Sequence, residues 1–127
     1  MWVSSYPNDE DPMPWQDMET GVFHSIQHNL EGGCPSRRAS ADLPCQVGTH
    51  QFSLDGFEWF YTGVAYTNLV EYTDGSSRVF DRRERPHLVF EENTTRPIAL
   101  SNSARPGGAY GDRTFTLVQG LRTKSTI

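Results

Sequence analysis

The chain has 127 residues, a length that suits one domain or part of one. Its net charge of −5 argues against a general nucleic-acid binder, and no apolar run reaches the roughly 18–20 residues that span a bilayer. We therefore expect neither a nucleic-acid partner nor a membrane partner. Seven Phe, five Tyr, three Trp and eleven Gly favour a β-rich, turn-rich globule over a helical bundle.

Short alternating or apolar runs, bounded by turn residues, predict an all-β chain without any apolar stripe of helical period. The expected strands are 14–17, 22–28, 49–54, 58–61, 69–73, 78–81, 87–91, 97–101 and 114–119. The Asp55-Gly56 pair and the DGSS run at 74–77 predict hairpin turns. The segments 31–46 and 103–113, rich in Gly, Pro, Ser and Arg, are expected to be loops.

The two cysteines and the N-terminus say little about the cellular location. Cys34 and Cys45 flank a polar segment without a CxxC pattern, so a zinc knuckle is not expected, and a disulfide and two free thiols both remain open. The N-terminal MWVSSYPNDEDP has neither the basic nor the apolar region of a signal peptide. We expect no metal and no cofactor.

Two segments of the chain share one pattern. EDPMPWQDMETGVFHSIQHN (10–29) aligns with ERPHLVFEENTTRPIALSNS (84–103), which places Glu10 on Glu84 and Pro12 on Pro86. Both copies read acid-x-Pro, an apolar strand, an acid, a polar turn and a second strand. Repeated short all-β units of this kind are typical of propeller blades, each a four-stranded antiparallel sheet.

With these residues in hand, the chain resembles the five-bladed β-propeller glycoside hydrolases of the family 43 type. Asp11-Pro12 followed by DMETGVFHSI (17–26) and RERP (83–86) resemble two blade openings, and HQFSLDGFEW (50–59) resembles the S-x-DG-x-x-W hairpin of glycan-processing propellers. The resemblance covers about residues 9–121. It implies an incomplete propeller domain of about two antiparallel four-stranded blades, open rather than closed into a ring. The blade-like units are about 9–81, with an insertion loop at 31–46, and 82–121.

The resemblance also assigns a candidate site. It implies that Glu84 is the general acid and that Asp11 modulates the pKa of that acid, in a two-carboxylate cleavage of glycosidic bonds. Strand alternation places Arg83 and Arg85 on the face opposite Glu84, where we expect them to pair with Asp81 or with acids of the neighbouring blade. The alternative interpretation of 82–85 is a solvated, charged turn.

Aromatic and histidine side chains are the expected contacts with a sugar. We expect Trp15 and Trp59 to stack on sugar rings, although aromatic residues in strands more often pack in the core. His50 and His87 lie near strand starts and are expected to hydrogen-bond sugar hydroxyls.

The hypothesis that follows is a fragment of a glycoside hydrolase that acts on an oligo- or polysaccharide in its full-length form. The general base belongs to a first blade that nothing upstream of Asp11 supplies, so we expect the isolated chain to be inactive and its missing blades to be partners. A secreted or extracellular location is favoured for the parent. The alternatives are a non-catalytic glycan-binding or interaction module on the same scaffold, and a small unrelated β-sandwich.

Overall fold

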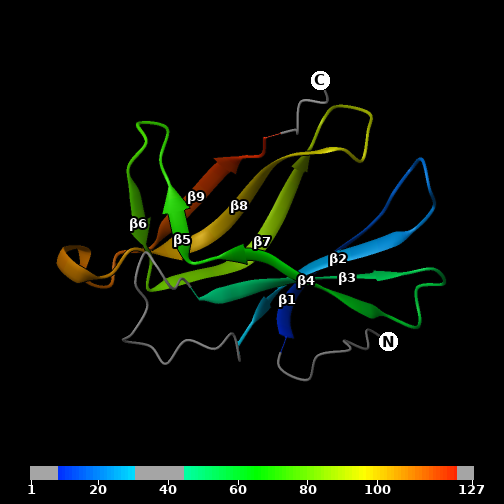
Figure 1. The fold of residues 1–127 in the computed structure, drawn as a ribbon, viewed down its shortest axis with the longest axis horizontal. Helices are drawn as coiled ribbons and strands as arrows, with labels where there is room; N and C mark the ends of the chain where they lie inside the picture. The colour runs from blue at the N-terminus through cyan, green and yellow to red at the C-terminus, as the bar shows by residue number, and fades with distance from the viewer. Residues whose placement is uncertain (1–8, 31–44, 123–127) are drawn as a thin grey trace.

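The computed structural model describes residues 9–30 and 45–122, which form three separate antiparallel sheets (Figure 1). The only helical element in these residues is a short 3-10 turn, η1 (Gly108–Tyr110). The predicted all-β class is therefore confirmed. No described residue belongs to a helix that could span a bilayer.

The first sheet is a four-stranded meander in the order β1-β2-β3-β4. Its strands are β1 (Asp9–Gln16), β2 (Phe23–Asn29), β3 (Gln46–Ser53) and β4 (Phe60–Thr67). The β1–β2 turn is fixed by Asp17, whose carboxylate accepts the backbone N–H groups of Glu19 and Thr20 at 2.7 and 3.2 Å. Gly21 completes this turn at a φ of 72°, where a side chain would be strained.

The other two sheets follow in chain order. A two-stranded hairpin consists of β5 (Leu69–Glu71) and β6 (Ser77–Val79), and a three-stranded sheet has the order β7-β8-β9. The bounds of the latter strands are β7 (Arg82–Phe90), β8 (Pro97–Arg105) and β9 (Phe115–Gly120). The second expected blade thus has three strands in the described residues, one fewer than a complete blade of four.

Two expected strands begin earlier than predicted. β1 starts at Asp9 rather than at residue 14, and β7 starts at Arg82 rather than at residue 87. In each case the pairing resumes beyond a bulge at the acid-x-Pro element, which lies between Glu10 and Met13 in β1 and between Glu84 and His87 in β7. A proline has no N–H to donate to a neighbouring strand, so Pro12 and Pro86 predict strand boundaries. In the structure a bulge accommodates each of them within its strand. The interpretation of 82–85 as a charged turn is therefore wrong.

The fourth expected strand is displaced along the chain. We expected it at 58–61, but residues 54–59 form the turn after β3, and β4 begins at Phe60. The predicted hairpin turns at Asp55-Gly56 and at 74–77 are both present.

The β1–β2 and β7–β8 hairpins are equivalent units that lie side by side. The residues before the two prolines, Asp11 and Arg85, both have a φ of 51°, and each hairpin closes with a backbone bond across its turn. The backbone N–H of Leu88 donates to the sulfur of Met13 at 2.8 Å, and that of Met18 donates to Thr95 Oγ1 at 3.0 Å. Because the contacts run in the same direction along both hairpins, from the strands to the turns that follow them, β1 and β7 are neighbours in adjacent sheets and point the same way.

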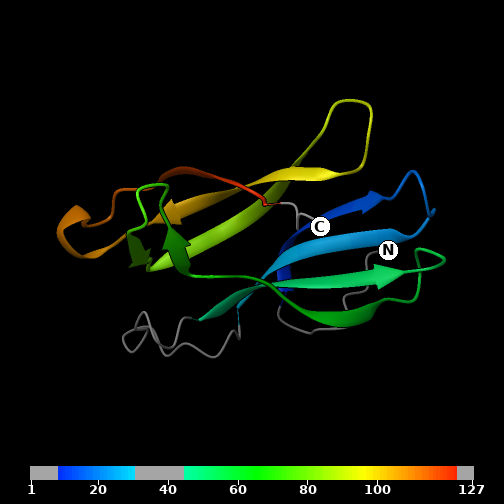
Figure 2. The same cartoon turned by 45° about the horizontal axis from the view of Figure 1, so that its top comes forward.

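The four-stranded and three-stranded sheets pack face to face, as two layers in Figure 2. Their shared core contains buried Ile26, Tyr66, Leu88 and Leu100, flanked by Met13, Trp15, Val47 and Phe90. A second cluster, of Val70, Phe80 and Ala104 with Leu117, joins the β5–β6 region to β8 and β9. Burial of each large apolar side chain contributes about 1.5–3 kcal/mol to the free energy of unfolding.

Cys45 is buried and disulfide-bonded, which excludes the alternative of two free thiols. Cys34, the only other cysteine of the sequence, and most of the expected insertion loop 31–46 lie outside the described residues.

Arg83 is a buried cation at the junction of the two layers, with only 2% of its surface exposed. Its guanidinium donates to Thr67 O at 2.8 Å, Asn102 Oδ1 at 2.9 Å and Gln119 Oε1 at 3.1 Å, and so ties β4, β7, β8 and β9 together. It also lies 4.9 Å from the centre of the Tyr66 ring. No ion pair joins it to a carboxylate of the described residues, and burial lowers its pKa.

We expect Arg83→Gln to lower the free energy of unfolding by about 2–4 kcal/mol, because a shorter side chain leaves buried acceptors without a donor. Urea unfolding followed by tryptophan fluorescence measures this change. Arg85→Gln is the matched control, since Arg85 is exposed, and its effect should stay within about 0.5 kcal/mol. Equal stability of the Arg83→Gln and Arg85→Gln variants would contradict the role given to Arg83.

Within residues 9–30 and 45–122, β9 pairs with β8 alone, and the open edge that this leaves predicts self-association. β9 contains no charged residue and no proline, its pairing with β8 is free of bulges, and Val118 is 63% exposed. We expect the average mass in sedimentation velocity to rise with concentration, and Val118→Lys to suppress this rise. Leu54→Lys, which changes an exposed turn residue, is the control. A wild-type chain that is monomeric at every concentration would refute this expectation.

Candidate functional site

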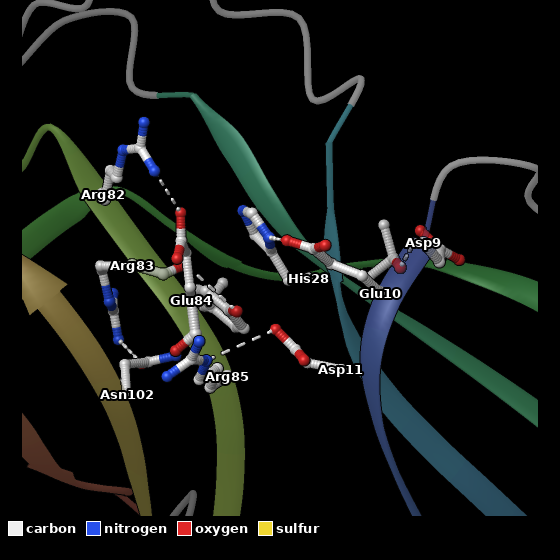
Figure 3. Close-up of polar contacts among 11 residues, drawn as sticks. Asp9, Glu10, Asp11, His28, Arg82, Arg83, Glu84, Arg85 and Asn102 are labelled. Atoms are coloured by element: carbon white, nitrogen blue, oxygen red, sulfur yellow. Dashed lines mark hydrogen bonds and ion pairs between the residues drawn. The ribbon is translucent and has the colours of Figure 1, made fainter.

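The starts of β1 and β7 place Asp11 and Glu84 at the same end of the paired strands (Figure 3). Both side chains reach solvent, with 41% of Asp11 and 25% of Glu84 exposed. The acid-x-Pro bulges lie next to them, because Asp11 is inside the bulge of β1 and Glu84 is the last paired residue before the bulge of β7. The two residues that the sequence singled out thus lie near the starts of neighbouring strands, each beside a different arginine.

Two ion pairs surround these carboxylates. Arg82 Nη1 lies 3.3 Å from Glu84 Oε1, and Arg85 Nε lies 4.0 Å from Asp11 Oδ2 on the neighbouring sheet. Arg85 thus contacts an acid of the neighbouring unit, as predicted. The prediction that it lies on the face opposite Glu84 is wrong, because the bulge after Glu84 breaks the alternation and both side chains line one hollow. Arg83 instead points into the core and binds neutral acceptors.

Glu84 also lines a hollow of about 240 Å³ at the end of the three-stranded sheet. Its other lining residues are Arg82, Arg85, Ser103, Arg105 and Thr114. Asp11 lies outside this hollow and reaches its rim only through Arg85. A ligand in the hollow would therefore meet Glu84 directly and Asp11 through an arginine.

A further carboxylate, Glu10, lies on β1 beside Asp11 and was missed as a site residue. Its Oε1 lies 2.9 Å from Nδ1 of His28, a side chain that is only 10% exposed. The sequence repeat could have identified Glu10 as a site residue, because Glu10 aligns with Glu84. Its contact with His28 on β2 does not follow from the sequence pattern.

Trp15 and His50, two of the expected sugar contacts, meet in an aromatic stack with His24. The Trp15 and His24 rings are 5.2 Å apart and nearly parallel, and His24 lies 5.2 Å from His50. The stack sits on the face of the four-stranded sheet that packs toward β7, beside Phe90. Trp59 and His87 lie elsewhere.

Hydrogen bonds in the stack determine which ring nitrogens of His24 and His50 donate and which accept. Thr62 Oγ1 donates to the carbonyl of His50 at 3.1 Å, so the same hydroxyl accepts from His50 Nδ1. His50 Nε2 is then an acceptor for His24 Nδ1, which lies 3.1 Å away. Burial, and then the charge of His24, lower the pKa of His50, which keeps it neutral at pH 7.

Trp59 belongs to the turn between β3 and β4. Gly56 N–H donates to Ser53 Oγ at 2.8 Å, and Asp55 Oδ1 accepts from the backbone of Phe57 and Glu58 at 2.8 and 2.9 Å. These backbone bonds, that of Glu58 first, lower the pKa of Asp55. The Trp59 indole N–H donates to Gly56 O, with the ring only 9% exposed. The S-x-DG-x-x-W residues thus all serve the turn.

His87 is exposed on β7, opposite Ser101 of β8. Among the described residues, no group of three or more His, Cys, Asp or Glu side chains is arranged to hold a metal ion. Comparisons of the chain with family models, with curated proteins and with solved structures gave no match.

The lowered pKa of His50 predicts a pH-dependent stability. The unfolded chain binds a proton at His50 more readily than the folded one. The contribution of neutral His50 to stability is therefore complete above the unfolded pKa of about 6.5 and is lost as the pH falls from there through the lower folded pKa. We expect the wild type to lose more unfolding free energy between about pH 7.5 and about pH 5.5 than His50→Gln does. Urea titrations at each pH measure this difference. His87→Gln, which removes an exposed imidazole, should keep the wild-type loss, and equal losses in the wild type and His50→Gln would contradict the assignment.

Proposed function

We propose that this chain is part of a carbohydrate-active β-propeller and contributes two neighbouring blades to it. The observation that carries the proposal is the parallel, side-by-side arrangement of β1 and β7, each opened by the same acid-x-Pro bulge. In a propeller, the first strand of every blade lies nearest the axis, and equivalent acids of successive blades converge there. Glu10 and Glu84 are the equivalent acids of the two strands, and Asp11 follows Glu10 directly, at the position that Arg85 has in the second unit.

The sheet order supports the same architecture. The four strands of the first sheet follow in chain order, as strands do from the axis of a propeller to its rim, and the two sheets pack face to face. The units of the proposal are about 9–81 and 82–121. The free edge of β9 is where a fourth strand of the second blade would pair.

Glu84 is the proposed general acid because it is partly exposed, lines a hollow and sits at the mouth of a first strand. In a two-carboxylate mechanism it would donate a proton to the leaving oxygen, and a second carboxylate would activate water from the opposite face of the sugar. Asp11 is the proposed modulator, linked to the hollow through Arg85. A substrate must displace Arg82 from Glu84 before this proton transfer.

The Arg82–Glu84 ion pair also favours a second candidate, a glycan-binding module without catalysis. A carboxylate held by a guanidinium accepts hydrogen bonds from sugar hydroxyls, and a binding site needs no proton from it. This candidate keeps the same scaffold and the same hollow.

Substitution of Glu84 in the longer chain that carries the remaining blades separates the two candidates. We expect Glu84→Gln to reduce hydrolysis of a natural oligosaccharide by about 10²–10⁴-fold, and to reduce hydrolysis of an activated aryl glycoside far less, because an activated leaving group needs little protonation. Steady-state rates on both substrates measure this. Glu91→Gln, which removes the partner of Arg96 at the far end of β7, is the control. Unchanged rates on both substrates would refute the catalytic role and leave the glycan-binding candidate.

A further inference from the structure

Two arginines stand directly opposite each other at the end of the three-stranded sheet. Arg82 of β7 is the cross-strand partner of Arg105 of β8, and Glu84 faces Ser103 next to them. Like charges at opposed positions of an antiparallel pair destabilise a sheet, so this pair has no explanation in the stability of the fold.

The opposed arginines open onto the hollow of about 240 Å³ that also contains Arg85. Ser103 and Thr114 add two hydroxyl groups to its lining, and Glu84 is its only acid. The lining thus has three guanidinium groups and one carboxylate, and Asp11 and Asp112 contact Arg85 and Arg105 from outside it. The size of the hollow suits one small ring or one acidic group rather than a polymer segment.

Arg105 is held only weakly by the protein. Its Nη1 lies 3.6 Å from Asp112, a fully exposed side chain, and an exposed pair of this kind contributes little. Its Nε is buried and has no hydrogen-bond partner in the described part of the chain. Arg85 likewise has only the 4.0 Å contact with Asp11. The terminal nitrogens of Arg105 and the guanidinium of Arg85 can therefore exchange these weak partners for a ligand, whereas the buried Arg105 Nε is out of a ligand's reach.

We propose that this hollow binds the carboxylate of an acidic sugar, a uronic acid unit of the glycan; this inference rests on the proposed function. Guanidinium groups bind carboxylates through two parallel hydrogen bonds, and the opposed Arg82 and Arg105 bracket one such group. The same chemistry would attract phosphate, but Glu84 in the same lining disfavours a doubly charged anion. The sugar hydroxyls would bond to Ser103, Thr114 and Glu84.

The proposal connects recognition with the chemistry of Glu84. Arg82 contacts Glu84 at 3.3 Å, and a bound uronate competes for the same guanidinium. Binding of an acidic sugar therefore releases Glu84 from its ion pair, whereas a neutral sugar leaves the pair intact.

The test uses the 127-residue chain and calorimetric titration with trigalacturonate and with its trimethyl ester, in which a methyl group on each carboxylate removes the charge. We expect the acid to bind at least about tenfold more tightly than the ester, and this preference to shrink at high salt. Arg105→Gln and Arg82→Gln should each abolish the preference, while Arg105→Lys retains part of it. Arg96→Gln, which removes an arginine from the opposite end of the sheet, should leave it unchanged. Circular dichroism confirms the fold of each variant.

Three outcomes would overturn the inference. Equal binding of acid and ester removes the uronate site but leaves the glycan proposal intact. An acid preference that persists in both Arg→Gln variants places the site elsewhere. Inorganic phosphate that binds as tightly as trigalacturonate, with the same dependence on Arg82 and Arg105, identifies a phosphate site instead. The Glu84→Gln rates in the longer chain judge the proposed function separately.

Discussion

The buried guanidinium of Arg83 is the constraint on which the arrangement of this protein depends. A cation placed in a protein interior without a carboxylate partner is costly unless its donors are satisfied. Here a backbone carbonyl of β4 and side-chain oxygens of β8 and β9 accept from its two terminal nitrogens, and Tyr66 covers it with its ring. Its Nε alone has no hydrogen-bond partner among the described residues. Because these acceptors come from both packed sheets, the position of Arg83 fixes how the two sheets meet.

Because the Arg83 side chain points into the core, it also determines which side chains of β7 face solvent. Successive side chains of a strand alternate between faces, so Arg82 and Glu84 must lie together on the other side of β7. The bulge after Glu84 then breaks the alternation, and Arg85 remains exposed and reaches toward β1. The hollow, the Arg82–Glu84 pair and the contact with Asp11 are therefore consequences of one buried residue and one bulge.

The sequence predicted those features that depend on neighbours along the chain. Strand-length apolar runs gave the all-β class, the turns at Asp55 and at 74–77 were found from their residues, and the acid-x-Pro repeat identified the two hairpins that lie side by side. The sequence pattern did not predict most of the contacts between side chains on different strands. Nothing in the pattern around Glu10 points to His28, and nothing around Arg83 points to Gln119. The proline of each repeat was misleading, because a proline ends most strands and a bulge is the exception.

The backbone is strained at Asp11 and Arg85, the residues before the two prolines, and this strain needs a physical explanation. A non-glycine residue at positive φ costs about 1–3 kcal/mol, and a long side chain such as Arg85 tolerates it less well than an aspartate does. A glycine would relieve the strain at both positions, yet it would remove Asp11 and Arg85, the two residues that link the neighbouring strands at 4.0 Å. That exposed pair is too weak to offset the strain through stability alone. The strain is therefore better explained by what the bulge positions, namely the carboxylate of Glu84 beside a cluster of arginines at the mouth of the hollow.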